Sequence, residues 1–164
     1  MKITVLNTGG TFNKRYNPLT GELEVTKDSL SLDKIIKNCH NIRFDIKNII
    51  SKDSLEFTLE DRELILKEIK NTRDDKIIII HGTDTIDLSA KFLDGKVEDK
   101  KVVFTGAMVP MSIDEVEATM NFAQALGFLN ANIENGIYIS MHGVVSLYSN
   151  LIKNRKLGQF LLND

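Results

Sequence analysis

Two short polar segments carry the side chains best able to do chemistry. Residues 8–11 read Thr-Gly-Gly-Thr and follow a β-branched apolar run. Residues 81–85 read His-Gly-Thr-Asp-Thr and follow the aliphatic run 76–80. Glycine permits backbone conformations closed to other residues and lets a ligand approach closely. Two hydroxyls, a carboxylate and free backbone N–H groups are the parts of an acyl-transfer site: a nucleophile, a group that positions water and an oxyanion site.

Each segment also has a less specific interpretation. A glycine-rich turn can cradle a phosphate, but the patterns G-x-G-x-x-G and G-x-x-x-x-G-K-[ST] are both missing, so a nucleotide site is the minor alternative and a structural turn is the other. His81 is a candidate general base, yet a histidine directly after a buried run is more often a hydrogen-bonded core residue. His40 and His142 belong to no motif. The three histidines and the single cysteine, Cys39, show no metal-ligand spacing, so we expect no metal and no organic cofactor.

The segments that must position these residues alternate between strand and helix patterns. Apolar runs predict strands at residues 2–7, 42–50, 76–80, 102–105 and 136–141, and a strand-like stretch at 144–151 before a polar tail. Apolar residues at helical spacing predict helices at residues 29–38, 59–71, 87–93 and 112–130. This alternation predicts an α/β fold: a single domain of residues 1–164 with a doubly wound, mainly parallel sheet and helices on both faces. Polar segments at strand ends converge on one edge of such a sheet, where ligands bind.

Three local features add detail to this outline. Thr58 and Asp61 form the pattern of a capping box at the start of the second helix. Turn-forming residues 17–22 lie between short flanks that could pair as a hairpin, which would be either a mobile lid or an ordinary surface hairpin. In the helix at 112–130 we expect these apolar side chains to face the core: Val116, Met120, Ala123, Leu126, Phe128 and Leu129.

Composition places the chain among soluble globular proteins. Hydrophobic residues make up 42% and charged residues 27% of the 164 residues. The net charge is −2 with both signs interspersed, which argues against a nucleic-acid or membrane partner. No apolar run approaches the length of a membrane span, and Lys2 is followed by no signal-peptide core. A lone cysteine cannot form an internal disulfide, so we expect a cytoplasmic protein.

Taken together, these motifs resemble those of the bacterial-type L-asparaginases, which are threonine amidohydrolases. The resemblance rests on residues 8–11 and 81–85, and it is supported by Thr-Gly-Ala-Met-Val-Pro at 105–110 and by Asn121. It extends over nearly the whole chain but matches only the amino-terminal, catalytic domain of that family. The family's usual smaller carboxy-terminal domain has no match in these residues, so the resemblance implies a short-chain form of asparaginase as an expectation.

The resemblance implies roles for individual residues. Thr11 matches the nucleophile that attacks the side-chain amide carbon and forms an acyl-enzyme. Thr83 matches the threonine that places water and polarises the amide, and Asp84 matches the acid that holds the α-ammonium group and supports a lysine. Lys153 matches that lysine by its spacing from Met141, although its neighbours depart from the family's arginine-aspartate-valine-threonine context. Lys153 beside Asp84 is expected to supply the base that a threonine hydroxyl needs.

Substrate-binding residues are implied in the same way. Ser54 matches the serine that binds the α-carboxylate, with Ser51 as the alternative. Tyr16 corresponds loosely to the lid tyrosine of the family. Backbone N–H groups of the glycine-rich turns, Gly10 included, are expected to meet the amide oxygen as it becomes an oxyanion.

The implied activity is hydrolysis of L-asparagine to L-aspartate and ammonia, although no residue decides between asparagine and glutamine. Because a partner subunit completes the site in long-chain relatives, at least a homodimer is expected. One alternative is a non-catalytic amino-acid-binding or regulatory protein on the same fold. Another is an amidase with a different amide substrate, such as a subunit acting on charged tRNA. Against a tRNA substrate stand the near-neutral charge and the absence of a basic surface run.

Overall fold

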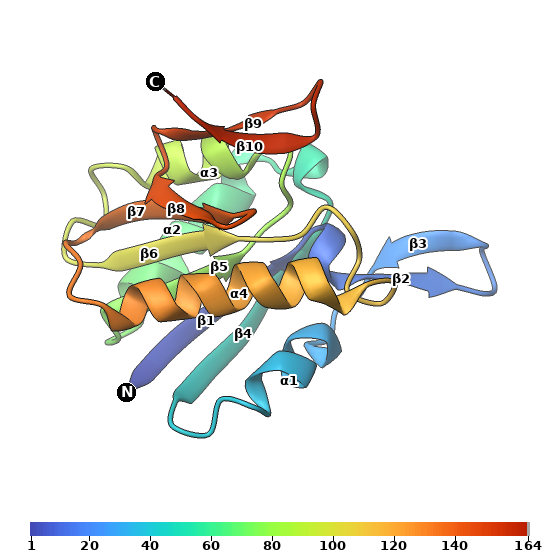
Figure 1. Cartoon of the computed structure of the whole chain (residues 1–164), viewed down its shortest axis with the longest axis horizontal. Helices are drawn as coiled ribbons and strands as arrows, with labels where there is room; N and C mark the ends of the chain where they lie inside the picture. Colours follow the sequence, from blue (N-terminus) through green and yellow to red (C-terminus); the bar gives the residue numbers. More distant parts are fainter. Residues whose placement is uncertain (164) are drawn as a thin grey trace.

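A computed structural model describes residues 1–163 and has a six-stranded sheet at its centre (Figure 1). The strand order is β4-β1-β5-β6-β7-β8. The bounds of these strands are β1 Lys2–Gly9, β4 Arg43–Lys52, β5 Lys76–Ile80, β6 Lys101–Thr105, β7 Gly136–Met141 and β8 Val144–Leu147. All but β8 run parallel, and β8 runs antiparallel to β7. The predicted α/β fold with a mainly parallel sheet is confirmed.

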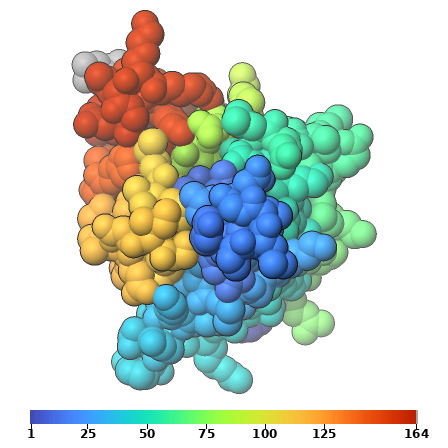
Figure 2. Space-filling model, turned by 90° about the vertical axis from the view of Figure 1, so that its right-hand side faces the viewer, coloured from blue at the N-terminus to red at the C-terminus, as the bar shows by residue number. Residues whose placement is uncertain are grey.

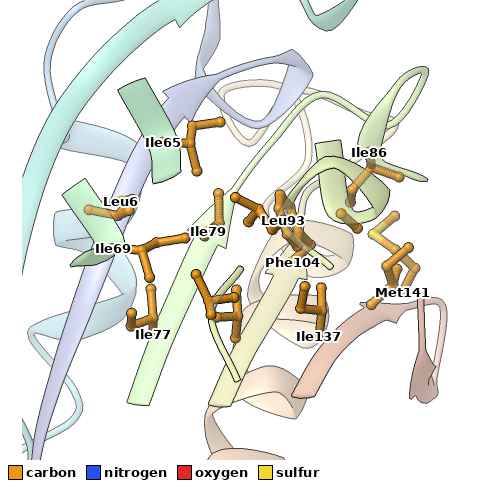
Figure 3. Packing of buried hydrophobic residues seen from close by; sticks show 14 of the residues in the cluster. Leu6, Ile65, Ile69, Ile77, Ile79, Ile86, Leu93, Phe104, Ile137 and Met141 are labelled. Atoms are coloured by element: carbon orange, nitrogen blue, oxygen red, sulfur yellow. The ribbon is translucent and has the colours of Figure 1, made fainter. Parts of the chain in front are cut away.

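Helices cover both faces of the sheet. Their bounds are α1 Leu30–Ile36, α2 Leu59–Asn71, α3 Ile86–Leu93 and α4 Glu115–Asn130. Side chains of α2 and α3 pack on one face, and those of α1 and α4 pack on the other. In β5, Ile77 and Ile79 belong to the first core, whereas Ile78 and Ile80 belong to the second. A parallel strand that is buried on both faces therefore reads as one aliphatic run; Figure 3 shows the core on the α2–α3 face.

Local sequence signals set the starts of the two long helices. At the start of α2, the Asp61 N–H donates to Thr58 Oγ1 at 3.4 Å and the Thr58 N–H donates to Asp61 Oδ2 at 2.9 Å, which confirms the predicted capping box. The start of α4 is later than predicted because Asp114 is its N-cap, accepting a hydrogen bond from the Val116 N–H at 2.8 Å. Within residues 1–163, every helix is too short or too polar to cross a bilayer.

The predicted core face of α4 is partly wrong. Val116 is 72% exposed and Met120 is 44% exposed, and Ala123 also faces solvent. The face that meets the sheet holds the predicted Leu126 and Leu129, while Phe128 is half-buried. The rest of that face holds the large apolar Phe122, which the prediction omitted, and three residues too small or too polar to mark an apolar stripe: Ala118, Asn121 and Ala125. Small side chains let the helix approach the sheet closely, and this closeness decides which residues are buried.

Two antiparallel hairpins flank the sheet. Their bounds are β2 Lys14–Asn17 and β3 Glu22–Val25 for the first, and β9 Leu151–Asn154 and β10 Gln159–Leu162 for the second. The first confirms the hairpin predicted around residues 17–22. The second corrects the prediction at the carboxyl end, because the stretch 144–151 is divided between two strands and the expected polar tail is folded. Leu151 and Phe160 anchor this hairpin in the core on the α2–α3 face.

The carboxyl ends of the parallel strands meet at one edge of the sheet, and Figure 2 views the molecule toward this edge. The blue hairpin β2–β3 lies near the centre of the view. The gold segment that leads into α4 lies to its left, and the red hairpin β9–β10 lies above that segment. Parts of the chain that are far apart in sequence therefore gather around the strand ends.

Candidate active site

The two glycine-bearing turns lie in direct backbone contact. Gly10 has a φ of 71°, and a Cβ at this position would lie 2.5 Å from Gly82 Cα. A Cβ on Gly82 would in turn lie 2.6 Å from Ser54 Oγ. Neither position can take a side chain unless its neighbours move. The turn after β1, the turn after β5 and the Ser54 segment after β4 are thus packed into one cluster at the strand ends.

Gly10→Ala is expected to lower the free energy of unfolding by about 2–4 kcal/mol, because it adds strain at positive φ to a steric clash. Gly21→Ala is the matched control, since Gly21 has a φ of 75° but a methyl group added there would meet no atom within 4 Å. The control should lose only about 1 kcal/mol. Denaturant unfolding of both variants measures the difference, and equal losses would contradict the contact between the turns.

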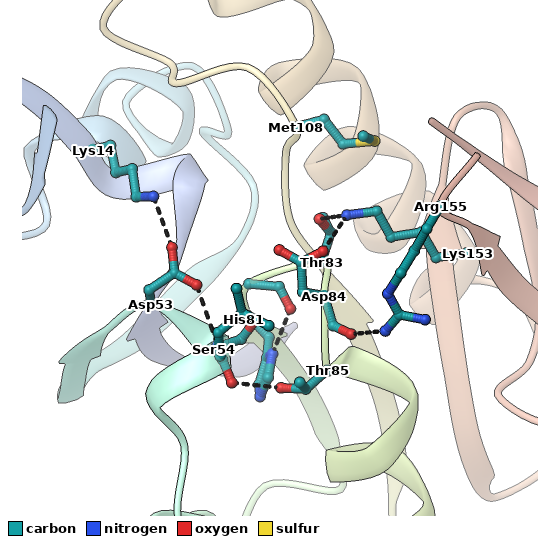
Figure 4. Close-up of polar contacts among 12 residues, drawn as sticks. Lys14, Asp53, Ser54, His81, Thr83, Asp84, Thr85, Met108, Lys153 and Arg155 are labelled. Atoms are coloured by element: carbon teal, nitrogen blue, oxygen red, sulfur yellow. Dashed lines mark hydrogen bonds and ion pairs between the residues drawn. The ribbon is translucent and has the colours of Figure 1, made fainter. Parts of the chain in front are cut away.

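Thr83, Asp84 and Lys153 form a connected polar group (Figure 4). Lys153 Nζ donates to Thr83 Oγ1 and to Asp84 Oδ1, each at 2.8 Å. Thr83 is 4% exposed and the Lys153 side chain is 11% exposed, so the ammonium group is largely shielded from water. The Arg155 guanidinium also donates to the Asp84 carbonyl oxygen. Lys153, which was matched in the sequence only by its spacing from Met141, is therefore the lysine that contacts Thr83 and Asp84.

Thr11 lies at the same cluster, directly after Gly10. It opens the short 3₁₀ helix η1, Thr11–Asn13, and is half-buried. Phe12 is 0% exposed, so its ring anchors the turn in the core. Thr8 braces the other end of the turn, because its hydroxyl is fully buried and donates to the last carbonyl of β5 at 2.7 Å. Of the two threonines, only Thr11 is partly exposed.

Ser54 presents a buried hydroxyl to this cluster. The residue is 1% exposed, and its Oγ has no hydrogen-bond partner among residues 1–163. A buried hydroxyl without a partner calls for an explanation such as a bound ligand atom. The Ser54 carbonyl oxygen is held by the Thr85 hydroxyl at 2.8 Å. The alternative, Ser51, lies on β4 and borders a different hollow together with Lys52 and Asp61.

An ion pair next to Ser54 ties the first hairpin to the cluster. Lys14 Nζ lies 2.7 Å from Asp53 Oδ2. Burial alone raises the pKa of Asp53, but hydrogen bonds from Lys14 and the Leu55 N–H, with the positive charges of Lys14 and Lys153, hold that pKa below its usual value. Asp53 and Lys153 thus share one electrostatic environment, although they lie far apart in the sequence.

The predicted lid tyrosine lies outside this cluster. Tyr16 is 63% exposed on β2 and pairs with Leu23 across the hairpin. The base of the hairpin is tethered, because Ser112 Oγ donates to the Lys14 carbonyl at 2.8 Å and the Thr26 N–H donates to a carbonyl of η1 at 3.3 Å. The structure brings Gly10, Ser54, Thr83, Asp84 and Lys153 together with the turn that bears Thr11, but not Tyr16.

Nearly the whole chain matches one known protein family. Residues 2–156 match the family described as Asparaginase, N-terminal. The chain belongs to the asparaginase family. An L-asparaginase from Thermococcus kodakarensis is 27% identical over 162 residues, which are 96% of this chain and 49% of that protein. A glutamyl-tRNA(Gln) amidotransferase subunit from Methanococcus vannielii is 29% identical over 150 residues, covering 87% of this chain and 34% of that protein.

A solved structure shares the fold of this asparaginase domain. The thermostable L-asparaginase from Thermococcus kodakarensis superposes with a TM-score of 0.86 at 26% sequence identity. The match covers 99% of this chain and 51% of the solved chain. The chain therefore spans about a third to a half of the length of these relatives.

His81 of the asparaginase motif is buried in the core. It is 0% exposed, and its Nδ1 lies 2.8 Å from the Gly82 carbonyl oxygen. Its ring packs between Phe57 and Phe104, with centroid distances of 4.6 and 5.7 Å. Burial lowers the pKa of His81 to about 4, although the hydrogen bond to Gly82 opposes this change. The interpretation of His81 as a hydrogen-bonded core residue is confirmed.

The buried His81 should make the fold sensitive to acid. An unfolded histidine takes up a proton below about pH 6.5, whereas folded His81 stays neutral down to about pH 4. This residue should therefore remove about 3 kcal/mol of stability as the pH falls from about 7 to 4. His81→Gln should reduce the pH dependence of denaturant unfolding in this range. His40→Gln, which changes an exposed histidine, is the control; an unchanged pH dependence in His81→Gln would contradict the assignment.

The loop after β6 is held by Glu117, a residue that the sequence did not single out as part of the site. Glu117 accepts hydrogen bonds from the N–H groups of residues 108–109, both at 2.9 Å, and lies 3.0 Å from His142 Nε2. Asn121, noted for its match to the family, donates to the Gly106 carbonyl and accepts from the His142 N–H, each at 2.9 Å. Glu117 and Asn121 stand at i and i+4 on α4, and this spacing was the available signal that they share a face.

Proposed function

We propose that this chain is an amidohydrolase that converts L-asparagine into L-aspartate and ammonia, with Thr11 as the nucleophile. The observation that carries the proposal is the position of the Lys153 ammonium, 2.8 Å from both Thr83 Oγ1 and Asp84 Oδ1. A shielded lysine beside a hydroxyl and a carboxylate is suited to activating a threonine. Membership of the asparaginase family and similarity to an L-asparaginase support this choice of reaction.

In the proposed reaction, the Thr11 hydroxyl oxygen attacks the side-chain amide carbon of asparagine. The Lys153 nitrogen, as an amine, accepts the hydroxyl proton by way of the Thr83 hydroxyl and passes it to the leaving nitrogen. The C–N bond then breaks and ammonia departs. Water placed by Thr83 then cleaves the ester, which restores the Thr11 hydroxyl and releases aspartate. The Gly10 N–H, expected to help here, already donates to the Lys52 carbonyl at 3.0 Å. The Thr11 N–H of the same turn would instead stabilise the negative charge on the amide oxygen in both steps.

The remaining groups of the substrate are assigned by charge and hydrogen bonding. We propose that the α-ammonium group binds Asp84 and that the α-carboxylate accepts a hydrogen bond from Ser54, whose hydroxyl is buried and free among residues 1–163. Tyr16 would reach the substrate only after movement of the hairpin as a lid. These steps use no metal and no organic cofactor. The same proposal includes a cytoplasmic location and assembly into at least a homodimer.

Ammonia release tests the proposed hydrolysis. The purified chain is incubated with L-asparagine or L-glutamine, and ammonia is measured by a coupled enzymatic assay. Added hydroxylamine should intercept the acyl-enzyme and divert product from aspartate to aspartyl hydroxamate. Absence of ammonia from both amides would refute the hydrolase. Aspartate binding measured by calorimetry would then test the non-catalytic, amino-acid-binding alternative.

A second candidate function rests on a different observation. The similarity to the glutamyl-tRNA(Gln) amidotransferase subunit, at 29% identity, is close to the 27% identity with L-asparaginase. In that role the chain would release ammonia from an amide for transfer to glutamyl-tRNA(Gln). The two functions differ in one measurable property. An amidotransferase component should release ammonia faster when glutamyl-tRNA(Gln) is added, whereas the asparaginase should be indifferent to it.

A further inference from the structure

The outer edge of the sheet at β4 is long and open. β4 ends the strand order and spans 10 residues, whereas about five to six is usual. Its neighbour β1 is buried along nearly its whole length, but in β4 only Ile50 is buried. The strand at the opposite edge, β8, has only 4 residues. A long edge strand without proline presents backbone groups that can pair with another strand.

The outward-facing backbone groups of β4 follow from its pairing with β1. The Arg43 N–H donates to the Met1 carbonyl, and the parallel register continues from there without a shift to Asn48. In a parallel pair, alternate residues turn both their N–H and their C=O toward the neighbouring strand. Phe44, Ile46 and Asn48 therefore turn theirs outward, away from β1.

We propose that β4 pairs antiparallel with β4 of a second copy of this chain, about a twofold axis at Ile46. An antiparallel hydrogen-bonded pair exchanges N–H and C=O groups between two residues that face each other. A twofold axis at Ile46 pairs this residue with the partner's Ile46. It also pairs Phe44 with the partner's Asn48. Each outward-facing N–H and C=O group of these three residues then has a hydrogen-bond partner in the second copy. The two sheets then continue as one across a closed, symmetric interface.

The charges of β4 select this register. Between the hydrogen-bonded pairs, Asp45 lies opposite the partner's Lys47, and Lys47 lies opposite the partner's Asp45. Opposite charges in a cross-strand pair are stabilising, whereas like charges are destabilising. An axis one residue earlier would place Asp45 against the partner's Asp45, and an axis one residue later would place Lys47 against the partner's Lys47. Both neighbouring registers are therefore disfavoured.

The two faces of β4 complement this arrangement. Phe44 and Ile46 pack against the core on the α1–α4 face but remain partly exposed, so a second copy would cover them further. Lys47 lies 3.0 Å from Glu68 of α2, which places its ammonium on the other face of the sheet. Asp45 shares that face because side chains alternate along a strand. Apolar contact and charge pairing thus occur on separate faces of the same interface.

Charge variants of β4 test the pairing. Asp45→Lys and Lys47→Asp each set like charges against each other twice in a dimer, so each should raise the dimer dissociation constant by about tenfold or more. Sedimentation equilibrium of the full chain measures this constant. An equimolar mixture of the two variants should recover dimers, because each mixed dimer again has opposite charges at both positions. Glu98→Lys makes the same change of charge as Asp45→Lys on an exposed loop and should leave the constant unchanged.

Circular dichroism and thermal unfolding of each variant separate loss of pairing from loss of folding, and recovery in the mixture itself requires folded chains. A wild-type chain that is monomeric at its highest soluble concentration would overturn the proposal. The proposal would also be overturned if either single variant had the wild-type dissociation constant. The same holds if the mixture contained no more dimer than each variant alone. The ammonia assay tests the proposed hydrolysis separately. A monomeric wild-type chain that releases ammonia would overturn this pairing and the proposed homodimer but leave the proposed hydrolysis intact.

Discussion

Thr11→Ala is expected to reduce ammonia release from L-asparagine by about a thousandfold or more while the protein stays folded. The reason is that no ester can form without the proposed nucleophile. The turn does not depend on this side chain: the Gly10 N–H donates to the Lys52 carbonyl at 3.0 Å, and the Asn13 N–H donates to the Gly10 carbonyl at 3.1 Å. The buried ring of Phe12 is also unchanged. The free energy of unfolding should therefore shift by no more than about 1 kcal/mol.

A matched control separates the role of Thr11 from a general effect of removing a hydroxyl. Thr20→Ala deletes the same atoms at the exposed tip of the β2–β3 hairpin and should retain the wild-type rate. Initial rates of ammonia release, with unfolding curves for each variant, provide the comparison. If Thr11→Ala kept more than about a tenth of the wild-type rate, Thr11 could not be the nucleophile.

Lys153→Met is expected to lower kcat for ammonia release by about a hundredfold or more, with a smaller effect on KM. Methionine keeps the length and the apolar stem of the side chain but removes the ammonium that contacts Thr83 and Asp84. The Asp84 side chain is 35% exposed, so water can solvate the carboxylate that loses its partner. The fold should therefore survive, and the loss should fall on the chemical step.

The same hairpin provides the control for this change. Lys156→Met alters an exposed lysine in the turn between β9 and β10 and should have the wild-type kcat. Lys153→Arg keeps the positive charge but replaces a compact ammonium with a planar guanidinium, so only part of the activity should return. Wild-type kcat in Lys153→Met would contradict the proposed role. An equal loss in Lys156→Met would instead point to a disturbed hairpin.

The inner strands of the sheet were predictable because burial on both faces leaves a plain signal. No polar residue interrupts the aliphatic run at 77–80, which is covered from both sides. The inward face of α4 was not predictable, since Ala118 is buried by close approach to the sheet while the larger Val116 is exposed. The β9–β10 hairpin was missed for a related reason. Its strands are only 4 residues long, and Leu151 and Phe160 are buried by elements distant in the chain.

In the candidate site, the turns were predictable from the sequence and the contacts between them were not. Gly10 and Gly82 stand at the ends of strands whose pattern is clear, and parallel strand ends converge. The contact of Lys14 with Asp53 depends on where a hairpin settles against a loop. The contact of Arg155 with the Asp84 backbone depends on the placement of the last hairpin. Neither placement is encoded in a local pattern, because both follow from the packing of the whole molecule.

The hairpin β9–β10 has a consequence for the order of folding. Its Lys153 meets Thr83 across a separation of 70 residues. Forming such a contact closes a long loop, and the chain loses entropy before the contact stabilises the protein. Contacts of this kind therefore tend to form after the local structure on either side. A refolding molecule would regain its helices before the ammonium reaches the two turns. Recovery of activity would then report the docking of one hairpin, and it should lag behind the recovery of circular dichroism.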